Sequence, residues 1–254
     1  MAVHDHNLGS VGRTFFSQNN AYAATLQSGS AAAYHNQFRG KCLGTTMTAE
    51  QSAQIQAGTF EDIYCGDFWE NNSVKYRIAE CYPLYRCGDS EIGHHVLCVP
   101  DSALLNAVMN SSNTTTGGYK GCAMRGSGGG LSQAKTIIQG VFGSHLKTYR
   151  DLITNAVSNG QASGWGWEDA CVELLPESAV YGSPSWGNNP YEMGIFNKQL
   201  ALFAQAPQFI HIRATWWLRS VSSAAYFANV GYYGHASYGG ASDSFGVRPL
   251  FLLS

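Results

Sequence analysis

The sequence predicts an α+β domain with short strands, two or three helices and an irregular C-terminal half rich in Gly, Tyr and Trp. Apolar segments typical of strands lie towards both ends of the chain, at residues 74–79, 94–100 and 247–253. A helical pattern of apolar residues occupies the middle, at 132–142. From Gly160 onward helix signals vanish, and short strand patterns alternate with turns. Strands at both ends with helices between them predict that the two ends lie side by side in one sheet.

The first 56 residues are rich in Ala, Ser, Asn and Gln and contain few large aliphatic side chains. Such a segment buries little apolar surface by itself. We therefore interpret residues 1–56 as an arm for attachment or oligomer contacts, with a disordered leader as the alternative. Within this arm, residues 49–56 fit a short helix before Gly58. The globular domain is predicted to span residues 57–254.

The first predicted elements of the domain are strands. Aromatic and β-branched residues at 60–64 and 74–79 predict two strands, separated by the turn-prone residues 70–72. The apolar segment 94–100 predicts a third strand that ends at a proline. Either of the next two residues can cap a helix over 101–109.

Two more helices are predicted in the middle of the chain. Residues 132–142 form the first, and residues 145–157 are interpreted as the second, because apolar residues recur at helical spacing in both. The residues that would share a face are Leu131, Ala134, Ile137, Ile138 and Val141 in the first, and Leu146, Tyr149, Ile153 and Val157 in the second.

A tryptophan pair marks a later strand. Side chains alternate between the two faces of a strand, so one indole of Trp216 and Trp217 is expected in the core and the other towards the surface. Arg219 is expected to pair with a buried carboxylate or to brace the loop that follows.

Composition excludes several classes of function. The formal net charge is -2 and charged residues make up 13% of the chain, about half of the usual share. No basic run is present, which argues against nucleic-acid binding. The polar start predicts no signal peptide, and no apolar stretch approaches a membrane span. The seven cysteines are an odd number without paired spacing, which predicts free thiols in a reducing cell.

Candidate catalytic and metal-binding motifs are weak. The glycine-rich residues 125–130 lack the Lys-Ser/Thr ending of a phosphate loop, which favours a flexible loop. His4-Asp5-His6 could hold a metal in an oligomer, where one copy supplies only part of the ligands, whereas His94 and His95 would point to opposite faces of a strand, which is poor for one ion. Glu168, Asp169 and Glu173 lie near Trp165 and Trp167 and could serve acid-base chemistry, but a solvated helix end explains them as well. We expect no catalytic residue, no metal and no cofactor.

The segment 222–244 carries the strongest functional signal. Tyr, Ser, Gly, Asn, Asp and His crowd positions that alternate with Ala, Val and Gly. This is the chemistry of antibody-like contact surfaces, in which Tyr supplies rigid contact and Ser, Gly and Asn adapt their hydrogen bonds. All of the polar residues are reachable when the adenines of an AAC codon are randomised. Lys, Glu, Gln, Met and Trp are not reachable, and all five are absent from the segment. An undiversified Gly/Tyr-rich loop is the alternative.

The two motifs that flank this segment support a family resemblance. Trp-Trp-Leu-Arg-Ser at 216–220 and Phe-Gly-Val-Arg-Pro at 245–249 resemble the end of C-type-lectin-fold variable proteins. These proteins are the targets of diversity-generating retroelements in phages and bacteria, and include major-tropism-determinant-type receptor-binding proteins of phages. Residues 76–79, 99–102 and 173–175 also resemble a family of phage and Firmicute domains with this ending. The resemblance spans about residues 57–254 and is most specific in the last forty or so.

The resemblance implies a C-type lectin-like fold, of the variant shared with formylglycine-generating enzymes, with a variable region at about 216–250. The implied variable, ligand-binding positions are Ser222, Ser223, Asn229, Gly231, Tyr232, Tyr233, His235, Ser237, Tyr238, Gly239, Gly240 and Asp243. The implied scaffold positions are Trp216, Trp217, Arg219, Phe245, Val247, Arg248 and Pro249. The calcium-binding tripeptides of lectins are absent, and no cysteine follows Cys171 to supply the reactive pair of formylglycine-generating enzymes.

The resulting hypothesis is a receptor-binding protein or adhesin, not an enzyme, on a virion or bacterial surface. It would bind a host-surface protein or glycan through the C-terminal face and other virion proteins through the arm. A homo-oligomer, such as a trimer, would add avidity. It would be made in the cytoplasm without a signal peptide and would insert in no membrane. The alternatives are an enzyme of formylglycine-generating-like fold or a hydrolase using Glu168, Asp169 or His145, and a structural virion protein.

Overall fold

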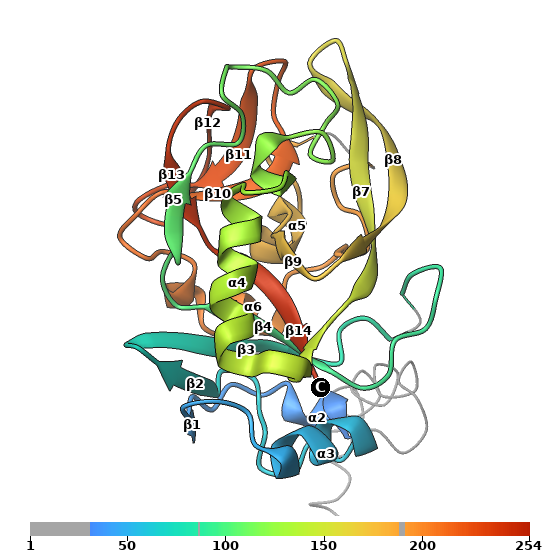
Figure 1. Cartoon of the computed structure of the whole chain (residues 1–254), viewed down its shortest axis with the longest axis vertical. Coiled ribbons are helices and arrows are strands. Elements are labelled where there is room, and N and C mark those ends of the chain that lie inside the picture. The colour runs from blue at the N-terminus through green and yellow to red at the C-terminus, as the bar shows by residue number, and fades with distance from the viewer. Residues whose placement is uncertain (1–30, 86, 188–190) are drawn as a thin grey trace, which may run out of the picture.

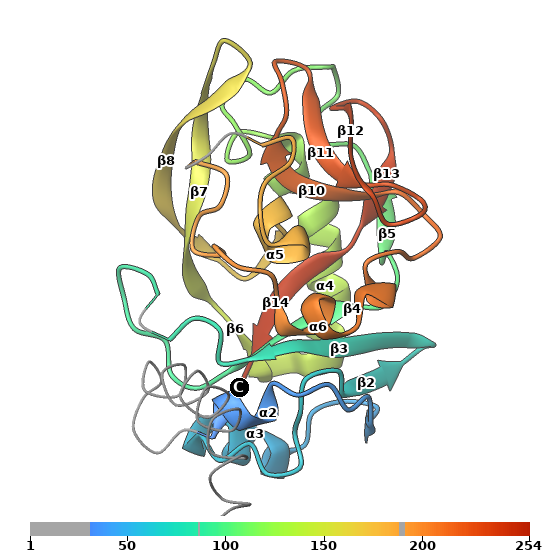
Figure 2. The same cartoon turned by 180° about the vertical axis from the view of Figure 1, so that it is seen from behind.

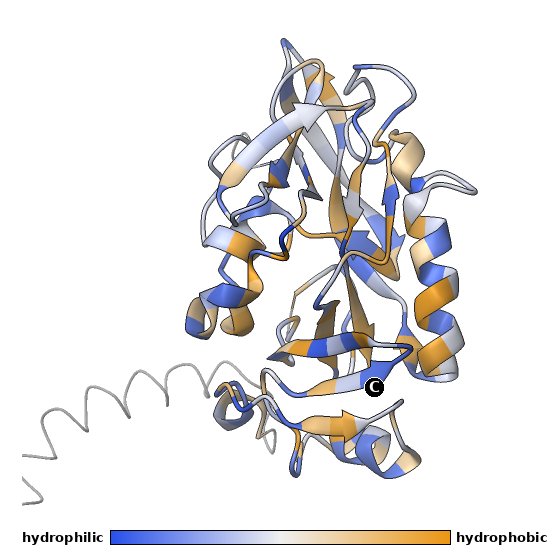
Figure 3. Cartoon of the chain, turned by 90° about the vertical axis from the view of Figure 1, so that its left-hand side faces the viewer, coloured by the Kyte–Doolittle hydropathy of each residue, from blue (hydrophilic) through white to orange (hydrophobic). Residues whose placement is uncertain are grey.

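The structure is a computed structural model that describes residues 31–85, 87–187 and 191–254. It is a mixed α+β structure dominated by sheets, with few helices (Figures 1 and 2). The α+β class predicted from the sequence is confirmed. Hydrophobic residues gather on the strands in the interior (Figure 3).

The largest sheet contains strands from both ends of the described chain, as predicted. Its order is β1-β2-β3-β4-β14-β6, with β9 also paired to β14. Only the β1–β2 pair is parallel. The strands are β1 (Cys42–Gly44), β2 (Phe68–Asn71), β3 (Val74–Cys81), β4 (Val96–Pro100), β6 (Leu146–Lys147), β9 (Val172–Leu174) and β14 (Pro249–Leu253).

The second sheet holds most of the predicted ligand-binding residues, and a separate two-stranded ribbon lies beside it. The sheet has the order β12-β11-β10-β13-β5, and the ribbon consists of β7 and β8. The sheet strands are β5 (Leu105–Ala107), β10 (Trp216–Val221), β11 (Tyr226–Val230), β12 (Ala236–Gly240) and β13 (Phe245–Val247); the ribbon strands are β7 (Tyr149–Ser158) and β8 (Gln161–Ala170).

Helices are short apart from α4, which runs along one side of the molecule from the first sheet to the second (Figure 1). In the described residues every helix is too short to cross a bilayer. The helices are α2 (Ala32–His35), α3 (Ala49–Ala57), α4 (Gly130–Phe142), α5 (Glu177–Tyr181) and α6 (Ala201–Gln205), with 3-10 turns η1 (Ala123–Arg125), η2 (Gly143–His145) and η3 (Pro207–Phe209).

Two hydrophobic clusters form the core, and strands β10 and β14 lie between them. Trp216 and Leu250 pack into one cluster, whereas their neighbours Trp217 and Phe251 pack into the other. Alternation along a strand sends successive side chains to opposite faces, so each of these strands supplies both clusters. A strand that is buried on both faces has a continuous run of apolar residues in its sequence, as residues 249–253 do.

The described part of the predicted arm is packed into the domain. Ala32 and Ile55 are fully buried in the core, and β1 pairs with β2. The predicted boundary at residue 57 therefore does not separate two packed units. The predicted helix is confirmed as α3, with a reciprocal cap between Thr48 and Gln51 and a left-handed Gly58 at its end. Residues 1–30, including the histidines at 4 and 6, lie outside the described residues.

Of the first two predicted strands, one is wrong and one is confirmed. The strand predicted at 60–64 is wrong: Phe60 and Asp62 have φ values of 52° and 50°, which no strand allows. The strand at 74–79 is confirmed as part of β3. Its hairpin with β2 turns through Asn72 and Ser73, both at positive φ, as a two-residue hairpin turn requires.

The helix predicted at 101–109 is wrong, because part of that segment is β5 in the second sheet. Leu105 and Ala107 pair with β13. The Trp217 indole N–H also donates to the Ala107 carbonyl at 2.8 Å. These partners lie more than a hundred residues along the chain, so local capping signals could not reveal them.

The helix predicted at 145–157 is also wrong, since most of it is β7. Tyr149, Asp151 and Ile153 are buried at every second position, which is a strand period. The helix predicted at 132–142 is confirmed as α4, although Ile137 is exposed and does not join the predicted face. The strand predicted at 94–100 is confirmed as β4.

Both tryptophans of the pair are fully buried, so the prediction that one faces the surface is wrong. The reason is the position of β10 between the two clusters, which leaves neither face free. Arg219 does pair with a buried carboxylate: its guanidinium donates to Asp151 at 2.5 and 3.3 Å. Both side chains are almost fully buried. All seven cysteines are free thiols.

Removing the Asp151 carboxylate should destabilise the fold strongly, because the buried Arg219 cation would lose its counter-charge. Asp151→Ala is expected to lose about 3–5 kcal/mol of unfolding free energy in urea denaturation. Asp151→Leu combined with Arg219→Met should lose less than either single change, because no unpaired charge remains buried. A double variant as unstable as the sum of the single variants would contradict this.

Candidate ligand-binding surface

The twelve predicted variable residues lie on β11, β12 and the loops at their ends, but they differ widely in exposure. Tyr233 is the most exposed, at 79%. The exposed residues are Tyr232, Tyr233, His235, Tyr238 and Asp243; the half-buried ones are Ser222, Ser223 and Ser237; the buried ones are Asn229, Gly231, Gly239 and Gly240.

The predicted residues do not share one face of the sheet. Ala228 pairs with Tyr238, and Asn229 pairs with Ser237. Neighbouring positions on a strand point to opposite faces, so Tyr238 and Ser237 lie on different sides. The exposed members of the predicted set therefore fall into two places. Tyr238 lies on β12, whereas Tyr232, Tyr233 and His235 lie at the β11–β12 turn.

The β11–β12 turn presents two tyrosines on a braced backbone. The rings of Tyr232 and Tyr233 pack edge to face with centroids 5.0 Å apart. The Gly231 N–H donates to the His235 carbonyl at 2.9 Å. The Tyr181 hydroxyl donates to the Gly234 carbonyl at 2.9 Å. These bonds hold the turn in one conformation while the tyrosine rings stay exposed.

Three exposed aromatic residues form what we call the aromatic platform: Trp186, Tyr226 and Tyr238. The Tyr238 ring lies 4.6 Å from that of Trp186 and 5.4 Å from that of Tyr226, centroid to centroid. Each of the three side chains is between 39% and 44% exposed. The Tyr238 ring packs against both of the others, so the three rings form a continuous contact surface.

Sequence reasoning missed Trp186 and Tyr226 as site residues. Tyr226 lies inside the segment singled out, on the same face as Tyr238 by strand register. Trp186 lies about forty residues earlier, in a loop of Gly, Ser and Pro. The sequence did contain a signal for Trp186, because a large aromatic residue in a short polar loop is expected to remain at the surface.

A buried carboxylate anchors the loop that carries Trp186. The backbone N–H groups of Trp186 and Gly187 donate to Glu177 Oε2 at 3.0 and 2.7 Å. Glu177 is fully buried. Burial raises its pKa, and the two amide donors counteract that rise. Trp186 is thus exposed at its ring and fixed at its backbone.

Glu192 lies beneath the same loop. A Cβ atom on Gly187 would lie 3.1 Å from Glu192 Cγ and 3.2 Å from Glu177 Oε2. Neither oxygen of the Glu192 carboxyl makes a hydrogen bond of good geometry with a described residue, although the Val221 backbone lies close enough to lower its pKa. Burial raises the pKa of Glu192 to about 8, although the nearby Arg219 cation lowers it. This shift favours the protonated form of Glu192 at neutral pH.

Asp243 is exposed, yet its carboxylate helps to close the loop after β12. It accepts a hydrogen bond from the Gly240 N–H at 2.8 Å. The preceding loop residue is tied to a distant segment, because the Ser242 N–H and hydroxyl both donate to Asn113 Oδ1, at 3.0 and 2.8 Å. Asp243 therefore has a structural contact in addition to its predicted role.

Three of the predicted variable glycines are closely surrounded. A Cβ atom on Gly231 would lie 2.4 Å from the His235 ring, and one on Gly239 would lie 2.5 Å from the Phe245 ring. At Gly240 the nearest atom would be Asn113 Oδ1, at 2.7 Å. A side chain at these positions requires the neighbouring side chain to move.

The predicted scaffold residues are buried, except for Phe245, which is half-buried. Arg248 is fully buried and donates to the carbonyls of Pro100 and Phe209 at 2.7 and 2.8 Å. Its guanidinium also lies 4.9 Å from the Trp216 ring centroid. Burial lowers the pKa of Arg248 to about 10, so the side chain remains charged at neutral pH.

The catalytic candidates are held in separate ion pairs. Glu168 pairs with Lys120, Asp169 with Arg150, and Glu173 with Arg125. Within the described residues no group of three or more His, Cys, Asp or Glu side chains could hold a metal ion.

His95 is fully buried, with its Nδ1 2.7 Å from the Gly93 carbonyl. His145 is half-buried and contributes its carbonyl to the Ser254 N–H. Residues 125–130 run from the last residue of η1 through a turn to the first residue of α4.

Comparison with known proteins finds no matching family model, no matching curated protein and no matching solved structure.

A side chain at Gly239 should destabilise the sheet. In Gly239→Ala the added methyl would displace the Phe245 ring, which packs 4.7 Å from Trp217. Overpacking of this kind costs about 1–3 kcal/mol of unfolding free energy in urea denaturation. Ser237→Ala on the same strand is the control and should change it by less than about 0.5 kcal/mol. Equal stability of both variants would instead indicate a site that is open to variation.

The raised pKa of Glu192 predicts a pH dependence of stability. The folded state holds a proton that the unfolded state releases between about pH 4.5 and 8, so stability from this group falls as pH rises through that window. Glu192→Gln keeps the neutral shape and should remove the fall. Denaturant titrations of both proteins from pH 5 to 9 would show the curves diverging with rising pH; parallel curves would refute the assignment.

Proposed function

We propose that this chain is a recognition protein that binds a cell-surface protein or glycan through the aromatic platform and the adjoining β11–β12 turn. The observation that carries the proposal is the exposure of Trp186, Tyr226, Tyr232, Tyr233 and Tyr238 on a buried framework. Exposed aromatic side chains in one region commonly mark interaction sites.

The physical basis is the low entropy cost of binding with such side chains. Tyr and Trp have two side-chain torsions, so little conformational freedom is lost when they contact a ligand. Trp186 is held through Glu177, and the turn is held through Tyr181. Binding to a surface that is formed in advance avoids the cost of ordering loops.

A more specific proposal, on the fold and the origin of the binding surface, rests on the family resemblance. We propose a C-type lectin-like fold of the formylglycine-generating-enzyme variant, diversified by a retroelement at the variable positions. The protein would act as a phage receptor-binding protein or a bacterial adhesin, located on a virion or cell surface. Support comes from the burial of Trp216, Trp217 and Arg248, since motif residues of a constant scaffold should be buried.

The genomic prediction of this proposal can be checked by sequencing the DNA that flanks the gene. A near-copy of the codons for residues 216–250, beside a gene for a reverse transcriptase, is expected. The two copies should differ mainly at adenines in the codons of the variable positions. Absence of both features would remove the retroelement from the proposal but leave the binding surface to be tested separately.

Loss of the exposed tyrosines should reduce binding. With fluorescently labelled protein on a panel of whole bacterial strains, Tyr232→Ala, Tyr233→Ala or Tyr238→Ala should weaken binding to a recognised strain at least about tenfold, a loss of ~1.4 kcal/mol. Tyr34→Ala is the matched control, because Tyr34 is 56% exposed and lies on α2. Unchanged binding by all three variants at unchanged stability would contradict the proposal.

A further inference from the structure

The β7–β8 ribbon is a two-stranded sheet that is joined to neither of the other sheets by strand pairing. Its strands are ten residues each, and the ribbon extends along one side of the molecule (Figures 1 and 2). Two-stranded ribbons are marginally stable unless they gain further strands or pack on a core. The outer edge of the ribbon, along β8, is therefore a place where a further strand could pair.

Hydrogen bonding shows which backbone groups of β8 face outward. The Lys120 N–H donates to the Thr154 carbonyl at 2.8 Å, so this carbonyl of β7 points away from β8. Thr154 lies opposite Trp165. In an antiparallel pair such a position is a non-hydrogen-bonded one on both strands. The N–H and C=O of Trp165 therefore point to the outer edge of β8, and by alternation those of Trp167 do the same.

These outward groups have no backbone partner among the described residues. On β7 the corresponding edge is covered at Thr154 by Lys120. An uncovered edge strand is a template for pairing with another strand. Charged residues and prolines usually block such pairing, but residues 161–167 contain neither.

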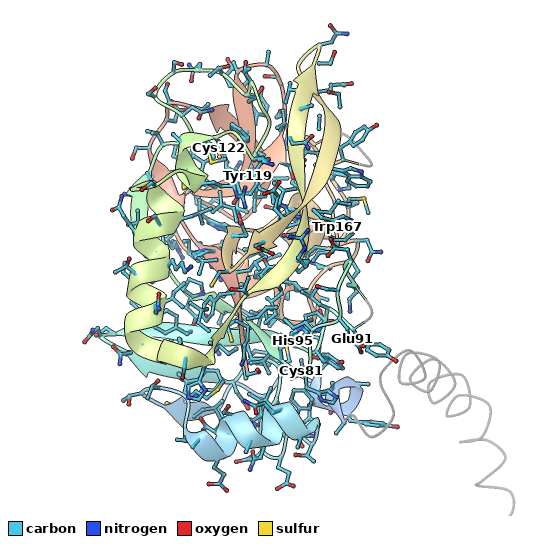
Figure 4. The ribbon with its side chains drawn as sticks, turned by 45° about the vertical axis from the view of Figure 1, so that its right-hand side comes forward. Cys81, Glu91, His95, Tyr119, Cys122 and Trp167 are labelled. Carbon is cyan, nitrogen blue, oxygen red and sulfur yellow. The ribbon has the colours of Figure 1, made fainter. Side chains whose placement is uncertain are left out.

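The side chains of the same residues are apolar and partly exposed, and the Trp165 ring packs edge to face against that of Tyr191, with centroids 5.4 Å apart. Trp165 and Trp167 are each 37% exposed, whereas Ala162 and Ala170 on the opposite face are buried (Figure 4 labels Trp167). Glycines at 164 and 166 separate the indoles. The acidic residues that follow are already paired, Glu168 with Lys120 and Asp169 with Arg150.

We propose that β8 pairs antiparallel with β8 of a second copy of this chain, about a two-fold axis at Gly166. In this register the outward N–H and C=O of Trp165 meet those of Trp167 in the other copy. By symmetry, those of Trp167 meet those of Trp165 in the other copy. The two Gly166 residues meet at the close, non-hydrogen-bonded position, where Cα atoms approach to about 4.5 Å.

The charge pattern of β8 favours the chain itself as the partner. In this register Glu168 lies opposite Gly164 and Asp169 lies opposite Ser163, so no two acidic residues face each other. Like charges directly opposite would be destabilising, and opposing aromatic residues are stabilising. Each copy thus supplies small uncharged residues opposite the acidic ones and an indole opposite an indole. The result is a four-stranded sheet with an isologous interface.

The dimer would place two recognition surfaces on one particle, which raises avidity without any new ligand contact. The proposal does not depend on the proposed function, since it rests on the ribbon alone. It specifies a two-fold contact, which differs from the trimer named as an example in the sequence analysis.

A charge swap tests the interface. Light scattering on the full chain of 27.4 kDa should give twice that mass at micromolar concentrations. The variant Trp165→Glu/Trp167→Glu and the variant Trp165→Lys/Trp167→Lys should each be monomeric, because like charges would face each other. Their equimolar mixture should regain the dimer mass. Tyr232→Glu/Tyr233→Glu, an exposed aromatic pair outside the ribbon, is the control and should remain dimeric.

Hydrogen exchange on the wild-type chain provides a test that is independent of how well the variants fold. The amides of Trp165 and Trp167 should exchange more slowly at high protein concentration than at low concentration. A wild-type chain that is monomeric throughout would overturn the proposal and assign the edge to a strand of another protein. A dimer whose mass survives both double variants would also overturn it.

Discussion

The burial of strand β10 on both faces is the constraint on which the rest of the structure depends. Trp216 and Trp217 are fully buried in different hydrophobic clusters. Full burial of aromatic side chains of this size contributes several kcal/mol and leaves little freedom of position. The loops that begin after Val221 therefore start from a strand that cannot shift, which is what allows exposed tyrosines to be presented in a defined arrangement.

Buried arginines reinforce this framework through hydrogen bonds to segments that lie far away in the sequence. Arg219 connects β10 to Asp151 of the ribbon. Arg248 connects the start of β14 to the carbonyls of Pro100 and Phe209. A buried guanidinium is costly unless its donors are satisfied. Arg219 has the Asp151 carboxylate as its acceptor, whereas Arg248 donates to two backbone carbonyls and leaves its Nη2 without a hydrogen-bond partner among the described residues.

Sequence reasoning succeeded where the pattern was local and failed where the partner was distant. Helices α3 and α4 carry their own periodicity and end signals. By contrast, β5 is a strand only because β13 and Trp217 lie beside it. The strand pattern of β7 was hidden because Asp151 occupies one of its buried positions, and a charged residue there reads as surface. Its burial is explained only by Arg219, almost seventy residues later.

The candidate surface was predicted in the same partial way. The segment 222–244 supplies Tyr226 and Tyr238, but the aromatic platform is completed by Trp186 from a loop anchored through Glu177. No periodicity links that loop to β12, so only the folded chain could show the contact. The arrangement has a consequence for recognition. If the predicted positions vary, Trp186 lies outside them and its backbone remains fixed. Every variant would then retain one large aromatic contact at the edge of the varying residues. Affinity would come partly from this constant contact, and selectivity from the residues around it.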